Sequence, residues 1–184
     1  MKKIIDAIKG TPVTVGIYAR PGDGKTALLL QAAQALTSET ETACLLSLEL
    51  SETGVRERLQ RMNAGPKRFA ILDAPHPTFA DVEDFLAKQD RVSVIAVDYL
   101  QLLSEDLRRR LKALAVKYNV PVLVTSQLPR AVEDRPQKRP TVEDIASGAF
   151  QPDAAVFIRR GDPAVIETLL PEQRMIATKF DQKH

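Results

Sequence analysis

The chain has 184 residues, of which 44% are hydrophobic and 27% charged, which is typical of one globular domain with a sizeable core. Its formal net charge is only +2, so binding to nucleic acid through overall basicity is excluded and any such contact depends on local clusters of basic residues. The single cysteine excludes a disulfide framework, and no apolar run approaches the ~20 residues that span a bilayer, so we expect a cytoplasmic protein without membrane contact.

Six apolar runs rich in β-branched residues follow one another along the chain. They lack strict alternation of polar and apolar residues, as do parallel strands that are covered on both faces. The runs occupy residues 12–19, 42–48, 68–74, 92–98, 120–126 and 154–160. Helical periodicity lies between them, over residues 25–38, 51–62, 78–88 and 104–119. The alternation predicts a doubly wound α/β fold with a mainly parallel sheet flanked by helices.

The pattern changes after the fifth apolar run. Residues 128–140 contain three prolines and no periodicity, so we expect a loop there. Two later apolar segments, residues 164–170 and 174–180, are separated by Pro-Glu-Gln. This spacing predicts a hairpin that extends the sheet with antiparallel strands near its edge. Cys44 lies inside the second apolar run, where we expect a buried, inert thiol.

Residues 19–26, ARPGDGKT, follow a predicted strand, open a predicted helix and nearly match the phosphate-binding pattern GxxxxGK[ST]. The difference is Ala19, which replaces the usual first glycine. In such a loop backbone N–H groups surround the β-phosphate, the Lys25 ammonium contacts the β- and γ-phosphate oxygens, and the Thr26 hydroxyl coordinates Mg²⁺. The carboxylate of Asp23 should point away, because a triphosphate repels it. The predicted nucleotide-binding residues are Arg20, Pro21, Gly22, Asp23, Gly24, Lys25, Thr26 and Ala27.

Three polar side chains stand at the carboxyl ends of predicted strands, the edge at which open α/β sheets bind ligands. Asp98 would hold Mg²⁺ through water, opposite Thr26. Glu49 could polarise the water that attacks the γ-phosphate, and Gln127 is within reach of that phosphate. Taken singly, Glu49 is an ordinary surface acid and Asp98 a helix cap, but their common place with Lys25 favours a nucleotide site.

Five segments occur in the order seen in DnaB-type replicative helicases: ARPGDGKT, LSLEL, VDYLQLL, TSQLPR and DRPQKRPTVEDIASGAFQPDAAVFIRR. Roughly residues 12–180 resemble the RecA-like motor domain of that family. The resemblance explains Ala19, since members of the family have alanine at the first position of the phosphate loop. It implies a RecA-like P-loop ATPase over residues 1–184 that acts on single-stranded DNA in replication. It also implies ATP and Mg²⁺ between the subunits of a homo-oligomer, usually a hexameric ring, and other replication proteins as partners.

By the same resemblance Glu49 is the catalytic base, Asp98 the Walker B acid, and Gln127 the switch that reports the γ-phosphate to a DNA loop. The residues themselves give a weaker indication of DNA contact, because four basic side chains follow Gln127 closely. They are Arg130, Arg135, Lys138 and Arg139. A solvated charged loop is the alternative, favoured by Glu133 and Asp134 among them. The arginines at 108–110 are more typical of a solvated helix face.

Some positions depart from the family pattern. Only residues 1–10 precede the first strand, where a helix with Ile4, Ile5 and Ile8 on one side would cover its own sheet or dock weakly on a neighbour. Family members carry a Lys-x-Arg near the end that enters the adjacent active site, whereas this chain offers Lys179 as the trans-acting candidate and no arginine. We therefore expect weak assembly and slow hydrolysis.

Two other functions stay open. A non-motor RecA-like module, such as a helicase loader, regulator or recombination mediator, would bind nucleotide or DNA without translocating. Residues 178–181, TKFD, imitate the guanine-recognition motif of GTPases, but the chain ends three residues later and no DxxG follows Asp98. A water-activating acid and a phosphate sensor together favour an ATPase over the non-motor module.

Overall fold

The structure, a computed structural model, describes residues 2–62, 68–132, 134–135, 141, 144, 150–159, 164–169 and 175–180. Each predicted apolar run forms a strand close to its expected bounds. The strands are β1 (Thr14–Ala19), β2 (Thr42–Ser47), β3 (Arg68–Asp73), β4 (Val92–Asp98), β5 (Val122–Gln127) and β6 (Ala154–Arg159). The predicted hairpin consists of β7 (Ala164–Leu169) and β8 (Met175–Phe180).

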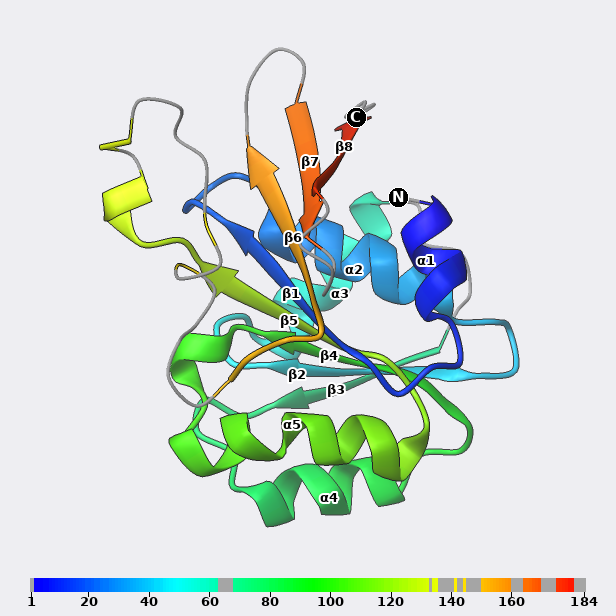
Figure 1. The fold of residues 1–184 in the computed structure, drawn as a ribbon. Helices are drawn as coiled ribbons and strands as arrows, with labels where there is room; N and C mark the ends of the chain where they lie inside the picture. The colour runs from blue at the N-terminus through cyan, green and yellow to red at the C-terminus, as the bar shows by residue number, and fades with distance from the viewer. Residues whose placement is uncertain are drawn as a thin grey trace.

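These strands form one sheet in the order β3-β2-β4-β5-β1-β6-β7-β8. The strands from β3 to β6 in this order pair in parallel, whereas β7 and β8 are antiparallel and extend the edge beyond β6. The helices are α1 (Lys2–Ile8), α2 (Lys25–Leu36), α3 (Glu52–Arg61), α4 (Phe79–Ala87) and α5 (Glu105–Tyr118). In Figure 1, α4 and α5 lie on one face of the sheet and α1 and α2 on the other. The predicted doubly wound fold with an antiparallel C-terminal hairpin is confirmed.

Two apolar layers separate the sheet from its helices. Successive residues of β2 face opposite layers, with Ala43 and Leu45 in the layer under α2, and Cys44 and Leu46 in the layer under α4 and α5. Each residue of β2 is therefore buried, which explains why its sequence shows no alternation. Burial also raises the pKa of the Cys44 thiol to about 12, so this cysteine is the inert thiol that we expected.

The N-terminal helix α1 packs on its own chain. Ile5 is buried in the layer under α2, and Ile8 packs partly against that layer. In the single chain this helix covers its own sheet, and docking on a neighbouring subunit stays a prediction. None of the helices in the described ranges is long and apolar enough to cross a membrane.

Two single-turn 3₁₀ helices were not predicted. η1 (Leu100–Leu102) follows β4 directly, and η2 (Arg130–Val132) lies in the expected loop after β5. Leu100 and Leu103 are buried in the layer under α5, so apolar contacts hold the first turn in place. One turn of helix is too short to produce a periodic sequence pattern, which is why both were missed.

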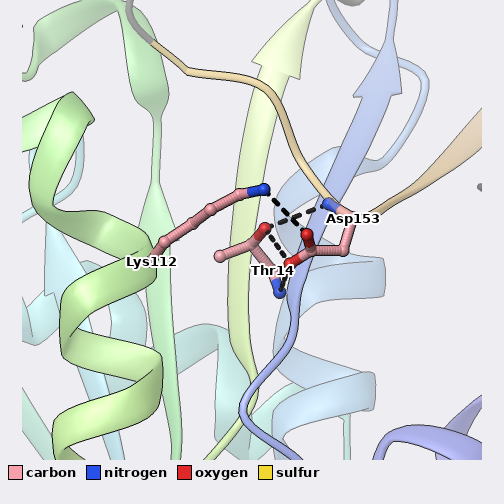
Figure 2. Close-up of polar contacts among 3 residues, drawn as sticks. All are labelled: Thr14, Lys112 and Asp153. Carbon is pink, nitrogen blue, oxygen red and sulfur yellow. Dashed lines mark hydrogen bonds and ion pairs between the residues drawn. The ribbon is translucent and has the colours of Figure 1, made fainter.

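The start of β6 is fastened to the start of β1 by Asp153, as Figure 2 shows. Its Oδ2 accepts hydrogen bonds from the Thr14 backbone N–H at 2.8 Å and from the Thr14 hydroxyl at 2.7 Å. Lys112 of α5 donates to Oδ1 of the same carboxylate at 2.8 Å. This junction joins β1, β6 and α5 at the amino ends of the strands, opposite the edge predicted to bind nucleotide.

Replacing Asp153 with Ala should lower the free energy of unfolding by about 2–3 kcal/mol, because the buried Thr14 donors lose their acceptor. Burial alone would raise the pKa of Asp153, but hydrogen bonds from Lys112 and Thr14 outweigh it and hold the pKa below its ordinary value. The stabilisation is therefore complete above about pH 4 and is lost as pH falls through the lower folded-state pKa.

Urea unfolding at pH 7 and pH 3 measures this effect. We expect the difference between the wild-type protein and the Asp153→Ala variant to shrink at pH 3, whereas an Asp84→Ala control on the exposed face of α4 should differ little from wild type at either pH. An equal difference at both values would show that the carboxylate charge of Asp153 contributes nothing.

Candidate nucleotide-binding site

The loop between β1 and α2 has a backbone suited to an anion. Gly22 and Gly24 have φ angles of 81° and 89°, in the left-handed region that other residues adopt only with strain. Gly24 is the N-cap of α2, and no side chain caps this helix end. The first N–H groups of α2 and the positive end of its dipole are therefore suited to bind phosphate.

Lys25, the first residue of α2, bends back over the loop. Its Nζ donates a hydrogen bond to the backbone carbonyl of Arg20 at 3.0 Å. Burial lowers the pKa of Lys25 from its ordinary value, while the nearby carboxylates of Asp98, Glu49 and Asp23 raise it again in part. A phosphate beside this partly desolvated ammonium would favour its charged form, so the position suits an anionic ligand.

The carboxylate of Asp98 is buried at the end of β4 and fixed from two sides. Thr26 of the phosphate loop donates its hydroxyl to Oδ2 at 2.7 Å. Thr125 of β5 donates its hydroxyl to Oδ1 at 2.5 Å. The hydroxyl of Thr26 and the carboxylate of Asp98 are thus in contact although 72 positions apart, as expected of two groups that share a magnesium ion.

Glu49 follows β2 on a tight turn rather than ending the strand. The Ser47 hydroxyl donates to the backbone carbonyl of Leu50 at 2.5 Å, and the Leu48 N–H donates to the carbonyl of Asp98 at 2.8 Å. These bonds hold the turn against the end of β4. The Glu49 carboxylate is exposed and lines the same pocket as Asp98.

A pocket of about 360 Å³ at the carboxyl ends of the strands brings most of the predicted residues together. From the predicted set it is lined by Pro21, Gly22, Gly24, Lys25, Thr26, Ala27, Glu49, Asp98 and Gln127. Arg20 and Asp23 do not belong to this lining. The donor set of a cation, backbone amides and a hydroxyl–carboxylate pair fits a magnesium–triphosphate group.

Three further residues line the pocket without having been predicted: Leu50, Arg58 and Tyr99. Of these, Arg58 is the candidate for phosphate binding, since its guanidinium can pair with phosphate oxygens. It lies on α3, where it flanks the buried Val55 and Leu59. Arg56 and Arg61 occupy the same short helix, so helical periodicity alone could not single out Arg58.

Of the predicted DNA-binding residues, the structure describes Arg130 and Arg135. Arg130 is exposed at the start of η2, three positions after Gln127. The Arg135 guanidinium makes two hydrogen bonds to the Asp144 carboxylate, at 2.5 and 3.0 Å, so a DNA phosphate would have to compete with this pair. Lys138 and Arg139 lie outside the described residues.

The trans-acting candidate, Lys179, belongs to β8 at the outer edge of the sheet. Its backbone stands opposite Val165 of β7. Its side chain is outside the description, so its reach toward a neighbouring subunit stays a prediction.

Comparison with known proteins identifies the family of the chain. The model of the DnaB-like helicase C-terminal domain matches residues 66–176, more than half of the chain. A probable plasmid replicative DNA helicase of Chlamydia trachomatis serovar L2 is 31% identical over 77% of the chain and 41% of its own length. The replicative DNA helicase DnaB of Geobacillus stearothermophilus is 30% identical over 86% of the chain and 47% of its own length. The chain thus spans less than half of each of these relatives.

A solved DnaB-like replicative helicase, described with its interactions with primase, has the same fold. It superposes with a TM-score of 0.75 at 20% identity, over 98% of this chain and 60% of the other. The fold and the family match agree with each other. The chain belongs to the family of DnaB-like helicase C-terminal domains.

Proposed function

We propose that this chain is the ATP-hydrolysing motor domain of a DnaB-like replicative helicase, with residues 1–184 forming one RecA-like unit. The observation that carries the proposal is the 2.7 Å hydrogen bond between Thr26 and Asp98, which joins the phosphate loop to the end of β4. The pocket around this bond also contains Lys25, Glu49 and Gln127. Two relatives named as replicative DNA helicases support the same function.

Each side chain has a separate task in the proposed reaction. ATP would be the phosphoryl donor, and Thr26 and Asp98 would hold a Mg²⁺ ion that would neutralise the phosphate oxygens. Lys25 binds the β- and γ-phosphate oxygens together with the loop amides. Glu49 accepts a proton from the attacking water, and Gln127 contacts the γ-phosphate.

We propose single-stranded DNA as the substrate that this site moves along. Gln127 ends β5, and the chain continues directly into residues 128–140, the proposed DNA-contacting loop. Exposed Arg130 can neutralise a backbone phosphate there, and Arg135 would do so by exchanging Asp144 for DNA. A change at the γ-phosphate would thereby reach the DNA through the end of one strand.

We further propose that copies of the chain assemble into a hexameric ring with ATP between subunits and Lys179 acting on the neighbour's site. The position two residues after Lys179 is Asp181 rather than an arginine, so we expect slow hydrolysis. Other replication proteins are proposed partners, with primase the first to test because a structural relative was solved for its interactions with primase. Because the proposed function is in DNA replication, we propose that the protein is located in the cytoplasm.

Arg58 should contribute to turnover within its own subunit. Replacing it with Ala should reduce kcat about 10- to 100-fold and leave the affinity for ADP nearly unchanged, if its guanidinium pairs with the γ-phosphate. Arg56→Ala on the same helix is the matched control, since Arg56 pairs with Glu52 and lies outside the pocket lining. Similar rates for both variants would remove Arg58 from the site.

The steady-state ATPase rate, measured over a range of protein concentrations with and without single-stranded DNA, tests the function as a whole. A rate that rises more than proportionally with protein and is stimulated by DNA indicates active sites shared in an assembling motor. Retained nucleotide binding with a DNA-indifferent or absent rate would contradict the motor and favour a helicase loader or regulator. A preference for GTP would favour the GTPase reading of residues 178–181.

A further inference from the structure

The carboxyl end of β5 is held differently on its two sides. Toward β1, the backbone ladder continues to the last residue of the strand, with Ala19 opposite Gln127. Toward β4, the ladder ends earlier, at Val97 opposite Val124. The last three residues of β5 therefore lack backbone pairing with β4, and side chains bridge the two strands instead.

Gln101, in the turn η1 that follows β4, makes a further bridge to the end of β5. Its Nε2 donates to the Ser126 hydroxyl oxygen at 3.0 Å and, more weakly, to the Gln127 carbonyl at 3.4 Å. The backbone of η1 is held in turn by Arg108 of α5, which donates to the carbonyls of Gln101 at 2.9 Å and Leu103 at 3.0 Å. A continuous chain of hydrogen bonds thus runs from α5 to the strand end that carries Gln127.

Arg108 differs from the two arginines that follow it. Arg109 and Arg110 pair with acids one turn earlier on α5 and form the solvated helix face predicted from the sequence. Arg108 is partly buried and points to the η1 backbone, so the prediction of a solvated face was wrong for this residue. One turn further along the same face, Lys112 binds Asp153. This face of α5 therefore fastens η1 and the start of β6 to one rigid element.

We propose that Gln101, held by Arg108, is a positioning residue that fixes the end of β5 and thereby presents the Gln127 side chain to the nucleotide pocket. The inference rests on the proposed function, since it assigns Gln127 to the γ-phosphate. Ser126 is buried, whereas Gln127 is exposed and lines the pocket, so the Gln101 bridge acts at the point where β5 leaves the core. Displacement of a reacting group by about 1 Å can cost up to about 100-fold in rate.

The test uses the full chain with Gln101→Met, which keeps side-chain length but removes the donor, and Arg108→Ala. Arg109→Ala is the matched control, because it removes the same charge one residue away without touching η1. We would measure the melting temperature, affinities for ADP and a non-hydrolysable ATP analogue, kcat, and hydrogen exchange of the amides from 122 to 132 with each nucleotide.

We expect the Gln101 and Arg108 variants to bind ADP and melt like the wild-type protein, while kcat falls about 10- to 100-fold. In the wild type and in Arg109→Ala, the ATP analogue should protect the amides around Gln127 more than ADP does. In Gln101→Met and Arg108→Ala, the two nucleotides should protect these amides equally. Arg108→Lys should retain part of the kcat and amide protection that Arg108→Ala loses, since its ammonium can make one of the two hydrogen bonds to the η1 backbone.

If Gln101→Met keeps the kcat and the amide protection of the wild-type protein, the inference is overturned. It is also overturned if the fall in kcat only parallels a fall in melting temperature, or if Arg109→Ala shows the same fall in kcat. The exchange measurement needs binding but not turnover. A wild-type chain that binds ATP without hydrolysing it therefore contradicts the ATPase while leaving the positioning testable. A wild-type chain that binds no nucleotide overturns both.

Discussion

Replacing Glu49 with Gln should stop ATP turnover while leaving nucleotide binding intact. The amide has nearly the same shape as the carboxylate, so the turn held by Ser47 and Leu48 should not change. The amide cannot accept a proton from the attacking water, however, and loss of a general base typically costs about 10²–10⁴-fold. We therefore expect kcat to fall at least 100-fold with little change in the affinity for ATP.

Steady-state and single-turnover ATPase assays with single-stranded DNA measure this fall, and equilibrium binding of a fluorescent ATP analogue measures the affinity. Glu57→Gln is the matched control, an exposed glutamate on α3 that does not line the pocket. Undiminished turnover in Glu49→Gln would remove Glu49 from the role of base. A loss of binding would assign the carboxylate to the binding step instead.

Replacing Lys25 with Ala should remove productive ATP binding without destabilising the fold. Charge-assisted hydrogen bonds contribute about 1.5–3 kcal/mol each, so two lost contacts to phosphate correspond to at least 100-fold in affinity. In the chain itself the Lys25 ammonium is partly buried, and burial lowers its pKa, so its removal relieves a desolvation cost. Stability without nucleotide should therefore stay equal or rise.

Thermal unfolding with and without magnesium–ATP separates the two effects. The wild-type melting temperature should rise with nucleotide, by mass action, whereas that of Lys25→Ala should not. Lys88→Ala, at the exposed end of α4, is the control and should respond like the wild type. A normal shift in Lys25→Ala would contradict the phosphate-loop assignment, and a lower starting temperature would show that the loop needs Lys25 to fold.

Much of the fold was determined by the sequence alone. Parallel strands between two helical layers are buried on both faces, so a continuous apolar run such as residues 92–98 indicates both a strand and its place in the interior. The predicted phosphate loop is equally local, because a strand, two glycines with left-handed φ angles and a helix start without a side-chain cap fall within a few consecutive residues. Asp98, Glu49 and Gln127 could be predicted because parallel strands bring their carboxyl ends to one edge.

Only the tertiary structure decided which other side chains meet at that edge. Thr125 reaches Asp98, Arg58 lines the pocket from α3, and Gln101 bridges to Ser126. Gln101 and Thr125 belong to segments that resemble the DnaB-type family, but neither the segments nor the hydrophobic period indicates which side chain each residue contacts in another element. Three adjacent arginines look alike in the sequence, yet only Arg108 points to the backbone of η1. The sequence determines periodicity and local turns, whereas the orientation of a side chain between two packed elements depends on both elements at once.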